Sequence, residues 1–123
     1  LCYGDVGERH FVEPRDAANL TRFANELTDA TTRPITWIHL PVPIERDDDA
    51  YFAPLEELAI GDAELYFGLV HRVDGVAGAA RRIEAAGRHV EEFGVATECG
   101  IGRAPQDATA DIFRTHVAVA AGR

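Results

Sequence analysis

The amino-acid sequence predicts an α/β fold built from parallel strand–helix units. Short, nearly continuous apolar runs alternate along the chain with longer stretches whose apolar residues have helical spacing. Such runs are typical of strands buried on both faces of a parallel sheet, and their alternation with helices is typical of βαβ units. Reactive side chains also stand at the ends of these runs, where parallel folds place their sites.

Three strands are predicted at residues 35–40, 64–71 and 92–97. The first residues, Leu1-Cys2-Tyr3, have the character of the end of a fourth strand, which would precede them all. The predicted order is therefore strand end, helix, strand, helix, strand, helix, strand, helix.

Four helices are predicted between and after these strands. The first begins near Pro14 and Asp16, a short one covers 52–58, a third covers 76–90, and the last begins at Pro105. Proline suits the first turn of a helix. In the three longer helices the apolar residues form one stripe each, which we expect to face the core: Ala17, Leu20, Phe23, Ala24 and Leu27; Val76, Ala79, Ala80, Ile83 and Ala86; Ala110, Phe113, Val117 and Ala121.

The alternation alone does not separate an open, doubly wound sheet from a closed barrel. Four units are about half of the ~250 residues of a typical (β/α)8 barrel. The chain also opens at Leu1, in the middle of a strand end, and contains no methionine. We therefore expect residues 1–123 to be a single partial domain, the last four βα units and thus the C-terminal half of a (β/α)8 TIM barrel.

Composition narrows the possible partners and the compartment. The 123 residues, 46% of them hydrophobic, suffice for one compact core. A formal net charge of −9 makes nucleic acid and acidic membrane surfaces unexpected partners. No run approaches the ~18 apolar residues of a membrane span, and no signal peptide is visible, so we expect a cytoplasmic protein. Two cysteines in such a chain favour thiol, core or metal roles over a structural disulfide.

The candidate site residues follow the predicted strands. Cys2 and Asp5 belong to the first unit, His39 ends the second strand, His71 ends the third, and Glu98 and Cys99 follow the fourth. Two thiolates with one or two imidazoles match the tetrahedral sulfur and nitrogen preference of Zn²⁺. The alternative is that both cysteines are small buried apolar residues. Asp5 has the alternative of a loop or helix cap, and His71 that of a core or solvent-facing residue.

Two motifs resemble signatures of the catalytic domain of the cobalamin-independent methionine synthase family, which belongs with uroporphyrinogen decarboxylase to one superfamily. These are Leu-Cys-Tyr-Gly-Asp at residues 1–5 and Ala-Thr-Glu-Cys-Gly-Ile-Gly-Arg at residues 96–103. In that family one strand ends in His-x-Cys-Tyr, a later one in Asp-x-His, and the last in Pro-Asp-Cys-Gly-Leu. The resemblance covers most of the chain and implies the last four units of a (β/α)8 barrel.

The resemblance implies a zinc site and a methyl transfer used in methionine biosynthesis. Cys2 and Cys99 carry over as two of four zinc ligands, and the family's histidine would lie one position before Leu1. Where the family has a glutamate ligand this chain reads Trp37-Ile38-His39, so His39 is expected to replace it. That exchange would change the summed charge of zinc and its ligands from −1 to 0. A more electropositive zinc would lower the pKa of a bound thiol further while making the thiolate less nucleophilic.

The implied reaction is methylation of a small-molecule thiol of the homocysteine type, with a folate-type or corrinoid-linked methyl donor. His71 matches the family histidine that assists proton delivery to the leaving amine, and Asp74 could orient it. Asp5 and Glu98 are expected near the substrate. Two alternatives stay open. One is a metal-free superfamily member of the decarboxylase type. The other is an inactive half-barrel that self-associates through its open strand edges.

Overall fold

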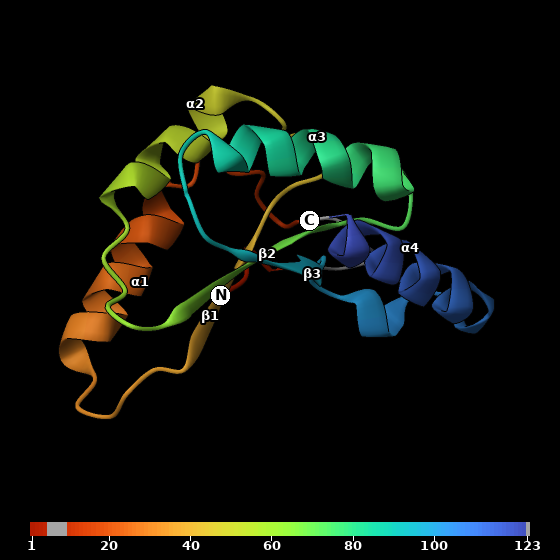
Figure 1. The fold of residues 1–123 in the computed structure, drawn as a ribbon. Coiled ribbons are helices and arrows are strands. Elements are labelled where there is room, and N and C mark those ends of the chain that lie inside the picture. The colour runs from red at the N-terminus through yellow and green to blue at the C-terminus, as the bar shows by residue number, and fades with distance from the viewer. Residues whose placement is uncertain (5–9, 123) are drawn as a thin grey trace.

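The fold is an open parallel sheet with its long helices packed against it (Figure 1), in a computed structural model that describes residues 1–4 and 10–122. The strands are β1 (Trp37–Pro41), β2 (Glu64–Val70) and β3 (Gly94–Thr97), and they pair in the order β1-β2-β3. Both pairings are parallel, as the apolar runs predict. The α/β class is therefore confirmed, and the bounds of these three strands lie within two residues of the prediction. Residues 1–3, predicted as the end of a fourth strand, are not part of a strand.

The helices alternate with the strands. They are α1 (Ala18–Ala30), α2 (Asp49–Phe52), α3 (Gly75–Gly87) and α4 (Thr109–Ala121), with 3-10 turns η1 (Ala53–Glu57), η2 (Ile101–Arg103) and η3 (Gln106–Ala108). The short helix predicted at 52–58 is thus α2 followed by η1. In the described part of the chain, no helix has the length and apolar character that crossing a bilayer requires.

The first residues lie beside β1. The amine of Leu1 donates a hydrogen bond to the carbonyl of His39, 2.7 Å away. This bond places the N-terminal segment at the outer edge of β1, next to the strand that follows it in sequence. The chain order along the sheet is therefore Leu1, β1, β2 and β3, without a reversal.

One face of the sheet carries the core. Leu40 in β1 and Phe67 in β2 are buried in a cluster with Ala24 of α1 and Ala79 of α3. Consecutive parallel strands connected by right-handed crossovers place their helices on a single face when the strand order does not reverse. Because side chains alternate across a strand, the intervening residues lie on the other face of the sheet, which we call the open face.

The open face carries aromatic rings. Trp37 is 60% exposed, and its ring meets that of Tyr66 edge to face with centroids 6.5 Å apart. The Tyr66 ring lies over its strand partner Gly94, because a Cβ atom at Gly94 would come within 2.3 Å of that ring. The edge-to-face contact is a favourable aromatic geometry. No described helix covers these rings.

Several helical residues that were predicted to face the core are exposed in the structure. In α4 the predicted stripe is exposed, with Phe113 at 64% and Val117 at 66%, while Ile112 and Val119 are buried instead. In α1, Ala17, Leu20 and Ala24 are buried as predicted, but Phe23 (54%) and Leu27 (39%) are exposed. In α3, Ala79 and Ala86 are buried and Ile83 partly so, whereas Val76 and Ala80 are exposed. The apolar stripes of α1 and α4 are present in the sequence, but part of each is exposed in the structure.

A fully buried guanidinium fixes the strand ends. Arg82 of α3 is 0% exposed and donates to the carbonyls of Leu69 and Ile44 at 2.9 and 2.7 Å. It also binds both carboxylate oxygens of Asp74, at 2.7 and 2.8 Å. Burial raises the pKa of Asp74, but the hydrogen bonds and charge of Arg82 outweigh it, so the net shift is downward. Bidentate pairs of this kind are the stronger charge-assisted contacts.

Asp74→Asn removes the charge that compensates Arg82. We expect the free energy of unfolding to fall by ~3 kcal/mol, because a buried ion is left without its partner. Asp47→Asn is the matched control, since its ion pair with Arg81 is exposed on both sides and such pairs contribute ~1 kcal/mol or less. Equal losses in the two variants, measured by urea unfolding, would contradict this account.

The same pair gives a pH dependence. Because the pKa of Asp74 is depressed in the folded state, its stabilisation is complete above the pKa of the unfolded chain and is lost as pH falls through the folded-state value. Asp74→Asn should therefore lose less stability than the wild type between neutral and acidic pH. Unfolding free energies at a series of pH values measure this difference.

Candidate functional site

The reactive side chains lie where parallel sheets place their sites, at the carboxyl ends of the strands. His71 is the first residue after β2, and Glu98 is the first residue after β3, directly before Cys99. Cys2 follows Leu1, which lies beside β1. We refer to Cys2, His71, Glu98 and Cys99 as the strand-end site.

The structure brings the two cysteines to neighbouring positions from opposite ends of the sequence. The thiol of Cys99 donates to the carbonyl oxygen of Leu1 at 3.9 Å, and that carbonyl belongs to the peptide bond that leads into Cys2. The Cys2 sulfur is exposed and accepts a hydrogen bond from the Gly4 amide at 3.3 Å, whereas Cys99 is partly buried.

His71 is buried among acceptors. The residue is 4% exposed. Its Nδ1 lies 2.9 Å from a carboxylate oxygen of Glu98, and its Nε2 lies 2.7 Å from the carbonyl of Val42. The expectation that Asp74 orients His71 is therefore wrong, because Asp74 binds Arg82 and Glu98 takes that place. The second oxygen of Glu98 accepts from the Arg72 amide at 3.2 Å.

His39 lies on the open face rather than beside Cys2. A Cβ atom at Gly68 would come within 2.6 Å of Nε2 of His39, so the imidazole leans over that glycine, toward Thr97. Burial, and then the nearby N-terminal amine, lower the pKa of His39 below its usual value. The lowered pKa favours the neutral ring, which is the form that ligates metals.

His39 and Cys2 line two different cavities. One, of about 600 Å³ on the open face, is lined by Trp37, His39, Tyr66, Glu98 and their neighbours. Cys2 instead lines a smaller cavity of about 360 Å³ beside α1. Leu1 contributes to both. The structure thus brings Cys99 near Cys2 and Glu98 near His71, whereas His39 lines the first of these two cavities and Cys2 the second.

The metal-ligand set is incomplete among the described residues. Within residues 1–4 and 10–122, no group of three or more His, Cys, Asp and Glu is placed to hold a metal ion. Asp5, expected near the substrate, lies outside the described residues. Cys2 and Cys99 carry the sulfur donors that Zn²⁺ prefers, but no third ligand stands with them among the described residues.

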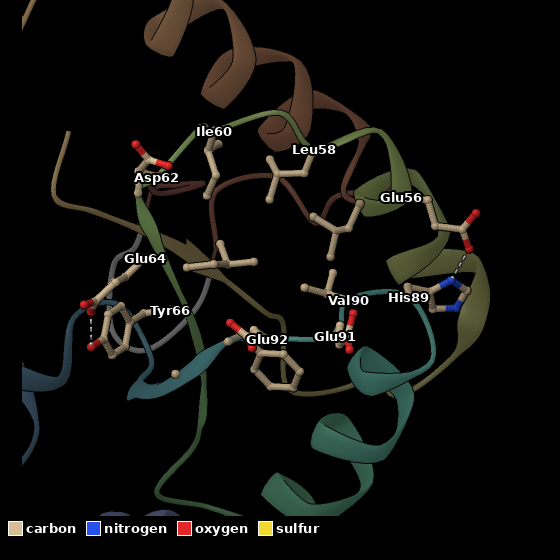
Figure 2. A pocket seen from close by; sticks show the side chains of 16 residues that line it. Glu56, Leu58, Ile60, Asp62, Glu64, Tyr66, His89, Val90, Glu91 and Glu92 are labelled. Carbon is tan, nitrogen blue, oxygen red and sulfur yellow. Dashed lines mark hydrogen bonds and ion pairs between the residues drawn. The ribbon is translucent and has the colours of Figure 1, made fainter. Parts of the chain in front are cut away.

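A larger cavity, of about 810 Å³, lies away from the strand-end site, at the amino ends of β2 and β3. Figure 2 shows its apolar floor, with Leu58, Ile60 and Val90, and carboxylates around it. His89 binds Glu56 there at 2.7 Å, and the Tyr66 hydroxyl donates to Glu64 at 2.8 Å. None of the predicted site residues lines this cavity, so we do not assign it to the candidate reaction.

Sequence reasoning missed the residues that shape the site. Gly68 is required beneath His39, and Val42 is the acceptor on the far side of His71. Glycine inside an apolar strand is a known signal of close approach, so Gly68 could have been found. Val42 could not, because its role is played by a backbone carbonyl.

Gly68→Ala should force the His39 ring out of its position. Overpacking of this kind costs ~1–3 kcal/mol. In a His39→Ala background the part of that loss due to the ring should disappear, and only the contact with the Thr97 carbonyl oxygen at 3.0 Å should remain. Gly87→Ala in α3 is the control, because a Cβ there meets nothing within 4 Å. Denaturant unfolding of the four variants, Gly68→Ala, His39→Ala, their double mutant and Gly87→Ala, measures this coupling. Additive losses at positions 39 and 68 would contradict the contact.

Comparisons with protein-family models, with curated proteins and with solved structures found no match to this chain. The resemblance to the methionine synthase family therefore stays a prediction that rests on the motifs around Cys2 and Cys99.

Proposed function

We propose that this chain is part of a zinc-dependent methyltransferase of the methionine synthase type, which methylates a small-molecule thiol of the homocysteine type. The observation that carries the proposal is the contact of the Cys99 thiol with the Leu1 carbonyl, next to Cys2, across 98 sequence positions. Both cysteines belong to the motifs that resemble the family, and the fold places them at one end of the sheet.

The barrel architecture is part of this proposal. A singly wound sheet, in which strand order follows sequence and the crossover helices share one face, is the arrangement of a (β/α)8 barrel. A doubly wound sheet needs a reversal of strand order. The open face would then be the interior of the barrel. The exposed apolar pairs at Phe23 and Leu27 of α1, and at Phe113 and Val117 of α4, would pack on neighbouring units.

The chemistry follows from the paired thiols. Zinc bound by thiolates would hold a substrate thiol as the thiolate near neutral pH, ready to attack an electrophilic methyl group. Cys2 and Cys99 would supply two ligands, and the others would come from outside the described residues or from a rearranged His39. Glu98 lines the cavity on the open face and offers a carboxylate near Cys99.

A self-associating half-barrel is the second candidate, and the open face favours it. Trp37 at 60% exposure is a large apolar side chain on an uncovered sheet face, and exposed apolar patches mark contact surfaces. Size-exclusion chromatography with zinc quantification separates the candidates. A zinc-free oligomer supports the second, and a monomer with one bound zinc supports the first.

Cys2→Ser and Cys99→Ser should each lower zinc affinity at least about tenfold, or ~1.4 kcal/mol. Serine keeps the size of the side chain but removes the soft sulfur donor. The measurement is equilibrium dialysis of the intact chain, together with thiolate-to-cobalt charge-transfer absorption after Co²⁺ substitution. His89→Gln is the control, because that histidine lies beside the other cavity. Unchanged affinity in both serine variants overturns the proposal.

His39→Glu tests the third ligand. If His39 moves to bind zinc, the carboxylate changes the net charge of the site, and zinc affinity and the rate of homocysteine methylation should both change. Unchanged values would remove His39 from the ligand set and leave the cysteine assignment intact.

A further inference from the structure

His71 joins the ends of all three strands. Each hydrogen-bond partner of its imidazole is the first residue after a strand: Val42 follows β1, and Glu98 follows β3. His71 itself is the first residue after β2. The imidazole therefore bridges two loops that the sheet hydrogen bonds do not connect directly, since β1 and β3 both pair only with β2.

Both ring nitrogens are engaged by acceptors. A carboxylate oxygen of Glu98 faces Nδ1 at 2.9 Å and the carbonyl of Val42 faces Nε2 at 2.7 Å, so both ring nitrogens have partners within the protein. The side chain is 5% exposed and His71 is not among the residues that line the open-face cavity. A group that hands its proton to a substrate needs a nitrogen directed at that substrate, and neither nitrogen of His71 has that direction.

Glu98, which is bound to His71, directly precedes Cys99 and restricts its position. One of its carboxylate oxygens accepts from His71 and the other from the Arg72 amide, while its own amide donates to the Val70 carbonyl at 3.1 Å. Glu98 is thus held at three atoms to the segment that ends β2. Beyond Cys99, Gly100 has φ = +79°, which turns the chain sharply. Cys99 stands between this anchored residue and this turn.

We propose that His71 is a positioning residue, which fixes the thiol of Cys99 through Glu98, and that it is not the proton donor of the reaction. The clamp formed by Val42, His71 and Glu98 holds Cys99 beside the Leu1 carbonyl and hence near Cys2. The consequence for catalysis rests on the proposed function, whereas the clamp itself rests on the geometry of these residues.

Two substitutions of His71 separate its hydrogen bond to Glu98 from its hydrogen bond to Val42. The amide nitrogen of asparagine stands near the place of Nδ1, so His71→Asn can still donate to Glu98. The amide nitrogen of glutamine reaches the place of Nε2, so His71→Gln can still donate to Val42 but gives up Glu98. The readout is the rate at which iodoacetamide alkylates Cys99 in the full chain, followed by peptide mass spectrometry, with Cys2 as the internal reference.

We expect His71→Gln to raise the alkylation rate of Cys99 by about fivefold, or ~1 kcal/mol, while His71→Asn stays near the wild-type rate. Cys2 should react alike in all three proteins. Glu98→Ala should reproduce the effect of His71→Gln, and it serves as the second variant if His71→Gln fails to fold, as judged by its thermal unfolding. Equal rates for Asn and Gln, or a parallel change at Cys2, overturn the proposal.

Zinc binding measured on the same proteins keeps the two proposals apart. If Cys99 responds as expected and the wild type binds no zinc, the clamp stands and the proposed function fails. If the wild type binds zinc through both cysteines but both His71 variants leave Cys99 unchanged and abolish methyl transfer alike, the positioning role is overturned in favour of a proton donor.

Discussion

The buried guanidinium of Arg82 sets the geometry on which the strand ends depend. It ties α3 to β2 through Leu69, to the loop after β1 through Ile44, and to the start of its own helix through Asp74. A charge without access to water requires all of these partners. The loop after β1 is therefore fixed relative to β2. His71, one residue beyond β2, finds the Val42 carbonyl at hydrogen-bonding distance because that frame is already in place.

The two faces of the sheet have different roles. The helix-covered face holds the contiguous apolar cluster that supplies most of the burial. The open face presents separate rings, a histidine and two glycines, with the strand-end site at its margin. A sheet of this kind, covered by helices on one face only, holds the strand-end residues in place and leaves a surface that other chain segments can cover.

The sequence predicted the strands well because buried parallel strands are continuous apolar runs, which are visible without tertiary knowledge. It predicted the helices but not all their buried faces: Phe113 and Val117 have the spacing of a core stripe, yet both side chains are exposed. Arg82 was not predicted, because an arginine in a helix normally indicates solvent. The convergence of Cys2 and Cys99 was predictable from parallel topology, whereas the partnership of His71 with Glu98 depended on loop paths that no local pattern encodes.

The ring-and-glycine contacts of the open face have an evolutionary consequence. Tyr66 covers Gly94, and His39 covers Gly68, so the same device occurs on two neighbouring pairs of strands. In each case the space for the ring exists only because the other strand lacks a side chain. Substitutions at these sites are therefore coupled, and a lineage that loses one of the glycines can keep its fold most easily by shortening the ring opposite. Related sequences should show positions 39 and 68, and positions 66 and 94, changing together.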